Sequence, residues 1–118
     1  MKEGKKSLLR QTQEKLTGGI ATNPISVIVE STNQGNFESK IVIRNHVLVS
    51  DQPFGFHGGN KGPKPSELVL AALAACQETT FRLYAEDMGI EINTISVSLT
   101  GVQDLTGFMG LDEKVPAG

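Results

Sequence analysis

The chain has 118 residues, enough for one domain, with 11 basic and 13 acidic residues and a formal net charge of −2. It offers no basic field for a nucleic-acid backbone, and no apolar run approaches the roughly 18 residues that a membrane span requires, so we expect neither partner. A single cysteine excludes an internal disulfide framework and makes a reducing cytoplasm the expected location. Since no cysteines and histidines cluster at metal-ligand spacing, we expect no metal and no bound cofactor.

The first half of the sequence predicts a short helix followed by strands. Good helix formers end at Gly18-Gly19, and apolar residues alternate with polar ones after Pro24. The turn sequence NQGN at residues 33–36 predicts a hairpin over residues 25–44, and Asn45-His46 turns the chain again. The expected elements are a helix at 3–17 and strands at 25–29, 37–43 and 47–49.

Residues 51–65 are rich in glycine and proline and predict a long loop. The loop does not fit the Gly-x-x-x-x-Gly-Lys-Ser/Thr pattern of a phosphate cradle, and no strand leads directly into one. We interpret it as a connection that delivers the following segment at a fixed angle, although loops of this length are often functional.

A long helix is predicted from about Pro65 to Met88. Proline in the first turn and Glu67 close behind favour its start, and Gly89 favours its end. Every residue from 68 to 76 is apolar or small, so this part has no polar face, a pattern typical of a helix that is buried on all sides. In the second half, Glu78, Arg82 and Glu86 recur at a spacing of four, which predicts an exposed edge with ion pairs.

After Gly89, alternating apolar residues predict a strand over residues 90–99. The stretch 104–112 is apolar but broken by glycines. One small sheet cannot cover a helix that is apolar all round. We therefore expect that another subunit covers the helix, that the chain is part of a longer protein, or both.

Several motifs in one fixed order resemble those of the OsmC/Ohr family, in its OsmC-like branch, over roughly residues 46–118. They are DQP at 51–53, GGNKGPKP at 58–65, EL at 67–68, LAALAAC at 70–76 and DLTGFMGLD at 104–112. The resemblance implies an α+β fold, with antiparallel strands packed on a long central buried helix in an intertwined homodimer. It also implies a single OsmC-like domain over residues 1–118, C-terminally incomplete relative to the family.

The resemblance further implies a lineage of thiol-dependent peroxidases that reduce organic hydroperoxides in the oxidative stress response. In that chemistry Cys76 would attack the O–O bond as a thiolate and become a sulfenic acid. A second, downstream cysteine would form a disulfide with it, which an external dithiol reduces. An arginine holds the thiolate, and a glutamate near the helix start holds the arginine.

This sequence departs from the family pattern at each supporting position. It has no second cysteine, so an external thiol is the expected resolving partner. Ser66 occupies the place of the family's glutamate, and Glu67 follows one residue later, about 100° round the helix. No arginine falls in a matching motif, and Arg44, at the end of the second predicted strand, is the candidate on physical grounds.

Two hypotheses follow for the function. In the first, the protein is a peroxidase in which Cys76, Arg44 and Glu67 are catalytic and an external thiol or dithiol is the reductant. In the second, it is a non-catalytic relative that binds a small apolar molecule at the dimer interface. Free cysteine also packs as a small hydrophobe in alanine-rich helices, so Cys76 could have a purely structural role.

Overall fold

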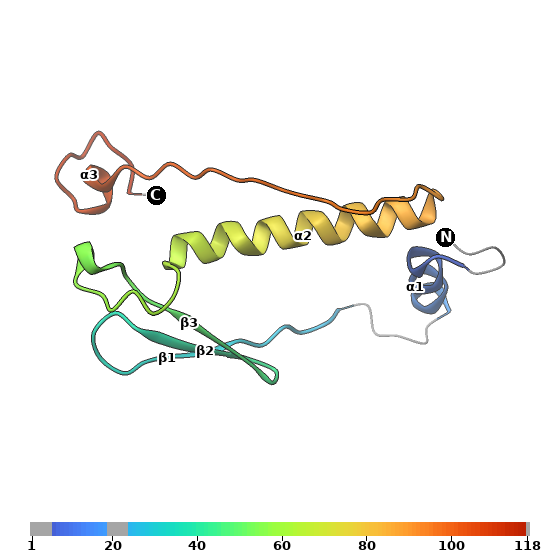
Figure 1. Cartoon of the computed structure of the whole chain (residues 1–118), viewed down its shortest axis with the longest axis horizontal. Helices are drawn as coiled ribbons and strands as arrows, with labels where there is room; N and C mark the ends of the chain where they lie inside the picture. Colours follow the sequence, from blue (N-terminus) through green and yellow to red (C-terminus); the bar gives the residue numbers. More distant parts are fainter. Residues whose placement is uncertain (1–5, 19–23, 118) are drawn as a thin grey trace.

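A computed structural model describes residues 6–18 and 24–117 of the chain. These residues form an α+β fold in which a three-stranded antiparallel sheet and a long helix are the main elements (Figure 1). The elements in chain order are α1 (Leu8–Thr17), β1 (Glu30–Asn33), β2 (Ser39–Ile43), β3 (His46–Ser50), the 3-10 turn η1 (Phe54–Phe56), α2 (Pro65–Asp87) and α3 (Leu105–Phe108).

The sheet has the order β1-β2-β3 and confirms the predicted hairpin. Its first turn is fixed by Asn33, whose side-chain oxygen accepts the N–H of Gly35 at 3.0 Å. The second turn is the pair Arg44-Asn45, since Ile43 lies opposite His46. Arg44 has a φ of 54°, a left-handed conformation that is uncommon for a residue with a side chain.

The first strand lies later than predicted. Residues 25–29 are extended but pair with no strand in the described part of the chain, and β1 begins only at Glu30. The reason is the register: Glu30 lies opposite Val42 near the end of β2, so residues 25–28 run past that end, where the chain turns away at Arg44. Periodicity identified residues able to form a strand, but pairing decides where the strand is.

Helix α2 confirms the predicted long helix. Its start is fixed by Pro65 in the first turn and by the Glu67 carboxylate, which accepts the backbone N–H of Lys64 at 2.8 Å. Its end is fixed by Gly89, whose φ of 70° is the left-handed conformation that stops a helix. Both terminal signals lie in the sequence itself.

Within one chain α2 is central but not buried, so the described residues do not supply the cover that its apolar sequence predicts. Of its residues only Ala85 is buried, while Val69, Leu73, Phe81 and Tyr84 are exposed. The described chain has a radius of gyration of 19.9 Å, whereas a compact domain of this length has about 13–14 Å. The single chain is therefore extended, and the apolar helix lacks a second covering layer.

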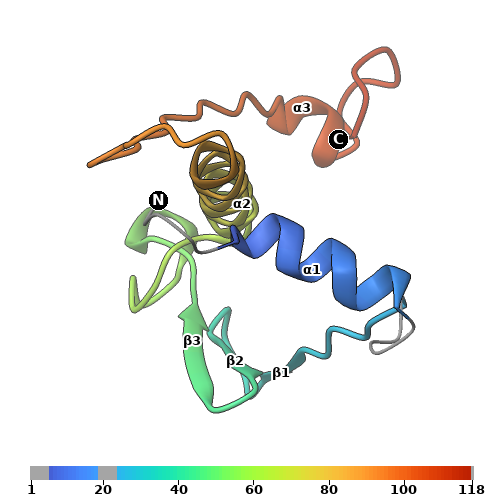
Figure 2. The same ribbon diagram turned by 90° about the vertical axis from the view of Figure 1, so that its right-hand side faces the viewer.

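The segment 90–104 is extended but is not the predicted strand, because no described strand pairs with it. It runs back beside α2 toward α3 (Figures 1 and 2). Ile95, Val97 and Leu99 are half-buried and the polar residues between them are exposed. Close approach is seen at Gly101, where an added Cβ would lie 3.2 Å from Cδ1 of Leu70. The alternation therefore reflects packing on a helix.

Helix α1 begins where Ser7 accepts the N–H of Arg10, and residues 3–5 of the predicted helix lie outside the described part. Helix α3, which periodicity does not predict, starts at Asp104, whose side chain accepts the N–H of Thr106 at 2.9 Å. No helix among the described residues is long and apolar enough to span a membrane.

Candidate functional site

Cys76 lies at the midpoint of α2 and its side chain is exposed in the single chain. The carbonyl oxygen of Cys76 accepts a hydrogen bond from the Thr80 hydroxyl at 2.9 Å, one turn further along the helix. The thiol is thus held on a rigid element and is open to a reactant or to a second chain.

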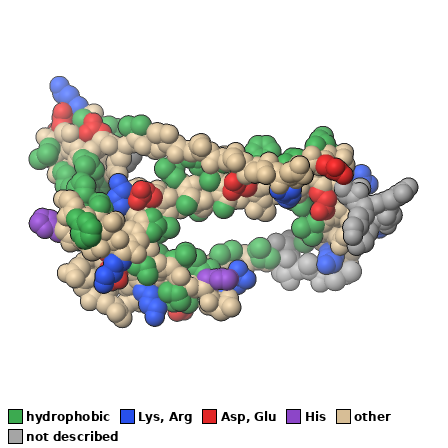
Figure 3. Space-filling view, in the orientation of Figure 1, with side chains coloured by type: hydrophobic (Ala, Val, Ile, Leu, Met, Phe, Trp, Pro, Cys, Tyr) green, Lys and Arg blue, Asp and Glu red, His purple; other side chains and the backbone are tan. Residues whose placement is uncertain are grey.

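The face of α2 around Cys76 is largely apolar and exposed. Residues three, four or seven positions away share a face of a helix, which places Val69, Leu73 and Thr80 beside the thiol. The side chains of Val69 and Leu73 are 68% and 46% exposed. Figure 3 shows apolar side chains along α2 and an open gap between α2 and the sheet side of the molecule. An apolar surface of this extent on a helix marks a binding face.

Glu67 does not share this face. It lies nine residues before Cys76, which is two and a half turns, so the two side chains project from opposite sides of α2 about 13 Å apart along the axis. The Glu67 carboxylate is engaged by the backbone N–H of Lys64 in the helix cap. Within one chain the structure therefore does not bring Glu67 to Cys76.

Arg44 is exposed in the turn between β2 and β3. Within residues 6–18 and 24–117 its side chain makes no hydrogen bond or salt bridge, and none joins it to Cys76 or Glu67. Figure 2 shows this hairpin turn on the side of the sheet away from α2. The three predicted site residues are thus separate in one protomer.

The predicted exposed edge of α2 is present, but its ion pairs are not found among the described residues. Arg82 instead donates a hydrogen bond to the carbonyl oxygen of Ile92, and Glu86 accepts the backbone N–H of Leu8 at 2.7 Å. The charged residues therefore hold neighbouring segments of the chain.

Asp51 organises the loop that leads into α2, and the sequence interpretation missed it. Its carboxylate is buried at 2% exposure and accepts three backbone N–H groups, from Gln52 at 2.7 Å, Gly59 at 3.1 Å and Lys61 at 3.2 Å. Burial opposes ionisation, but these donors and the Lys61 charge outweigh it and hold the pKa of Asp51 below its ordinary value. The signal in the sequence is an aspartate at the start of a glycine-rich loop, where its carboxylate can accept local N–H groups.

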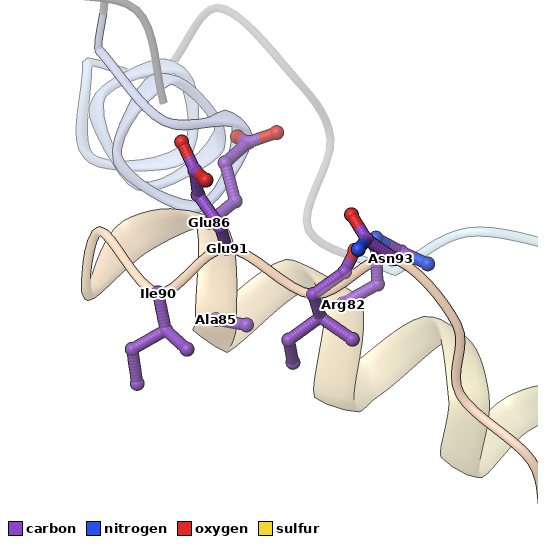
Figure 4. A pocket seen from close by; sticks show the side chains of 7 residues that line it. Arg82, Ala85, Glu86, Ile90, Glu91 and Asn93 are labelled. Carbon is purple, nitrogen blue, oxygen red and sulfur yellow. The ribbon is translucent and has the colours of Figure 1, made fainter.

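A pocket of about 310 Å³ lies near the end of α2, away from Cys76. It is lined by Arg82, Ala85, Glu86 and residues 90–93. Figure 4 shows the Glu86 and Glu91 side chains extending toward α1. Arg82 and Glu86 already bind backbone groups of the chain, whereas Glu91 and Asn93 make no side-chain hydrogen bond within the described residues.

Comparison with protein families gives a match to the family described as OsmC-like protein, over residues 58–115. The matched segment contains the end of the glycine-rich loop, all of α2 and α3. No curated protein matches the chain.

Proposed function

We propose that this chain, which belongs to the OsmC family through residues 58–115, is a thiol-dependent peroxidase that reduces organic hydroperoxides through Cys76. The observation that carries the proposal is the exposed Cys76 thiol at the centre of an unpartnered apolar helix face. An apolar surface beside the thiol suits the organic part of such a substrate.

In the first step the Cys76 thiolate attacks one oxygen of the hydroperoxide, the O–O bond breaks, and the other oxygen leaves as an alkoxide that takes a proton to become an alcohol. The sulfur is oxidised to a sulfenic acid. A first external thiol then displaces water to form a mixed disulfide, and a second thiol releases Cys76 and leaves as an external disulfide. We propose external thiols for this step.

We propose a homodimer as the active form. The apolar side of α2 needs a covering layer, and each large apolar side chain that becomes fully buried contributes about 1.5–3 kcal/mol. Because Cys76 is the midpoint of Pro65–Asp87, an antiparallel pair of α2 helices crossing at their centres would bring both thiols to the interface.

The helix dipoles favour the antiparallel arrangement, because it places the N-terminal end of one α2 beside the C-terminal end of the other. In such a dimer the arginine that stabilises the thiolate is proposed to be Arg44, from either copy, and Glu67 is proposed to hold it.

A second function is favoured by specific observations. Glu67 projects away from the thiol and is engaged in the helix cap, and within the described residues no hydrogen bond or ion pair joins Arg44 to Cys76. These features suit a relative that binds a small apolar molecule at the dimer interface without turning it over. The two functions differ in whether the hydroperoxide oxidises Cys76.

The experiment is a turnover assay with cumene hydroperoxide and an excess of a dithiol such as dihydrolipoamide. The peroxidase proposal predicts hydroperoxide consumption that requires both protein and dithiol and that is lost in Cys76→Ser. The matched control is Thr79→Ser, a similarly small change near Cys76 on the same helix, which is expected to retain activity. Equal consumption by wild type and Cys76→Ser would reject the peroxidase and leave the binding function.

A further inference from the structure

The N-terminal end of α1 is tied to the C-terminal end of α2, although the residues involved are about 80 positions apart in the sequence. The Ser7 hydroxyl donates to Oδ1 of Asp87 at 2.6 Å, and Nε of Arg10 donates to the same oxygen at 3.1 Å. The backbone N–H of Leu8 donates to Oε1 of Glu86 at 2.7 Å. Ser7 is buried at 2% exposure.

Glu86 and Asp87 lie at the C-terminal end of α2, where their negative charges do not stabilise that helix. Acids in a last turn oppose the helix dipole, and the last turn of α2 carries no basic residue. Helix α1, in turn, has no acid in its first turn. Glu86 and Asp87 therefore supply the negative charge that the N-terminus of α1 lacks. The charges of the two helix ends are compensated only while the helices are in contact.

This attachment is polar. Leu8 and Leu16 on α1 remain 58% and 40% exposed and Leu9 is half-buried, so no apolar side chain of α1 is fully buried there. Partly exposed ion pairs and hydrogen bonds are weakened by salt. A helix of 10 residues is also marginal on its own in water. Helix α1 is therefore expected to lose its structure when it leaves α2.

We propose that Ser7, Arg10, Glu86 and Asp87 form a releasable clasp that holds the start of α1 against the C-terminal end of α2. Figures 1 and 2 show α1 beside this end of α2. Opening the clasp frees α1 while the sheet remains intact, because β1, β2 and β3 pair with one another. The inference does not depend on the proposed enzymatic activity.

The test is hydrogen–deuterium exchange of the full chain, read by mass spectrometry of peptides, for wild type, Asp87→Asn and the control Glu78→Gln. Asp87→Asn keeps the size of the side chain and removes its charge, whereas Glu78 is an acid of the same helix outside the clasp. We expect exchange in α1 to become at least about tenfold faster in Asp87→Asn, and peptides of α2 residues 68–80 and of the sheet to be unchanged. Glu78→Gln is expected to match wild type throughout.

Ser7→Ala is the second variant, because it removes the hydroxyl donor and leaves both carboxylates in place. It is expected to reproduce the local loss of protection in α1, and 1 M salt is expected to do the same to wild type. The proposal is overturned if α1 exchanges at the wild-type rate in both variants. It is equally overturned if protection falls uniformly over α2 and the sheet, since the contact would then support the whole fold.

Discussion

The Oδ2 atom of Asp51 accepts the backbone N–H of Gly59 at 3.1 Å, and this bond closes the loop that positions the start of α2. The other bonds of the same carboxylate, and the bond from the N–H of Asp51 to the carbonyl of Pro63, anchor both ends of the loop. The angle at which α2 leaves the sheet thus depends on one buried charge.

Neutralising that charge is expected to loosen the loop. In Asp51→Asn a neutral amide with one acceptor oxygen replaces the carboxylate, so at least one of the three N–H donors faces the amide NH2 and loses its acceptor, and we expect the melting temperature to fall by several degrees. Faster hydrogen exchange at residues 59–61, with β1–β3 unchanged, would locate the effect. Unchanged exchange at these residues would contradict the role assigned to Asp51.

Acid should have a related effect. The pKa of Asp51 is lowered by its N–H donors in spite of burial, and the pKa of Asp87 is lowered chiefly by the Ser7 hydroxyl, with Arg10 adding to it. A carboxyl with a lowered folded-state pKa stabilises the fold above its unfolded value of about 3.9, and this contribution disappears as the pH falls through the lower folded value. Stability should therefore fall below about pH 4. Chemical denaturation of wild type and Asp51→Asn across this range should give a shallower pH dependence in the variant.

In the same loop, Gly62 lies so close to another backbone segment that a side chain at this position should destabilise the fold. A Cβ at Gly62 would lie 2.1 Å from the carbonyl oxygen of Val49, whereas a Cβ at Gly55 meets nothing within 4 Å. Gly62→Ala should therefore cost about 1–3 kcal/mol of unfolding free energy, and Gly55→Ala less than about 0.5 kcal/mol. Urea denaturation of the two variants makes the comparison, and equal stability would show that the loop is not closed as described.

The apolar face of α2 predicts self-association. In the proposed dimer Leu73 becomes buried, so Leu73→Asp should raise the dissociation constant by roughly 100-fold or more. Ser98→Asp adds the same charge on an exposed position of the extended segment and should leave the constant unchanged. Sedimentation velocity over a range of concentrations distinguishes the two. A wild type that stays monomeric at high concentration would remove the basis of the dimer.

Arg44 occupies a position that would suit glycine. Its φ of 54° is costly for a residue with a side chain, so Arg44→Gly should stabilise the fold by up to about 1 kcal/mol. If Arg44 also stabilises the Cys76 thiolate, the same variant should slow the reaction with hydroperoxide at least about tenfold. The matched control is Arg82→Gln, which also removes one arginine but from α2. A stabilised Arg44→Gly variant with full reactivity would assign Arg44 a turn role only.

Local signals explain what the sequence could predict. Proline, Glu67 and Gly89 define α2, and the NQGN turn defines the hairpin, because each acts within a few residues of itself. The predictions of strands at 25–29 and 90–99 were wrong. A strand forms only beside a neighbouring strand, and which segments become neighbours depends on register and on packing between distant parts of the chain.

The candidate site is less predictable than the fold for the same reason. The Ser7–Asp87 bond joins the start of α1 to the end of α2, 80 residues apart in the sequence, and no local pattern marks it. The loop role of Asp51 follows from the closure of residues 52–61 around its carboxylate. Cys76 could be placed on its helix face from spacing alone, but its surroundings in a dimer involve a second chain.

A peroxidatic Cys76 must react with a hydroperoxide faster than a free thiol does. This is measured by the intact mass of the protein after brief exposure to one equivalent of cumene hydroperoxide in the presence of a sulfenic-acid trap. We expect one adduct per chain on Cys76, formed much faster than on a free thiol under the same conditions, and none in Cys76→Ser. An adduct formed only at the free-thiol rate, or no adduct, would contradict it and make Cys76 a packing residue of a binding protein.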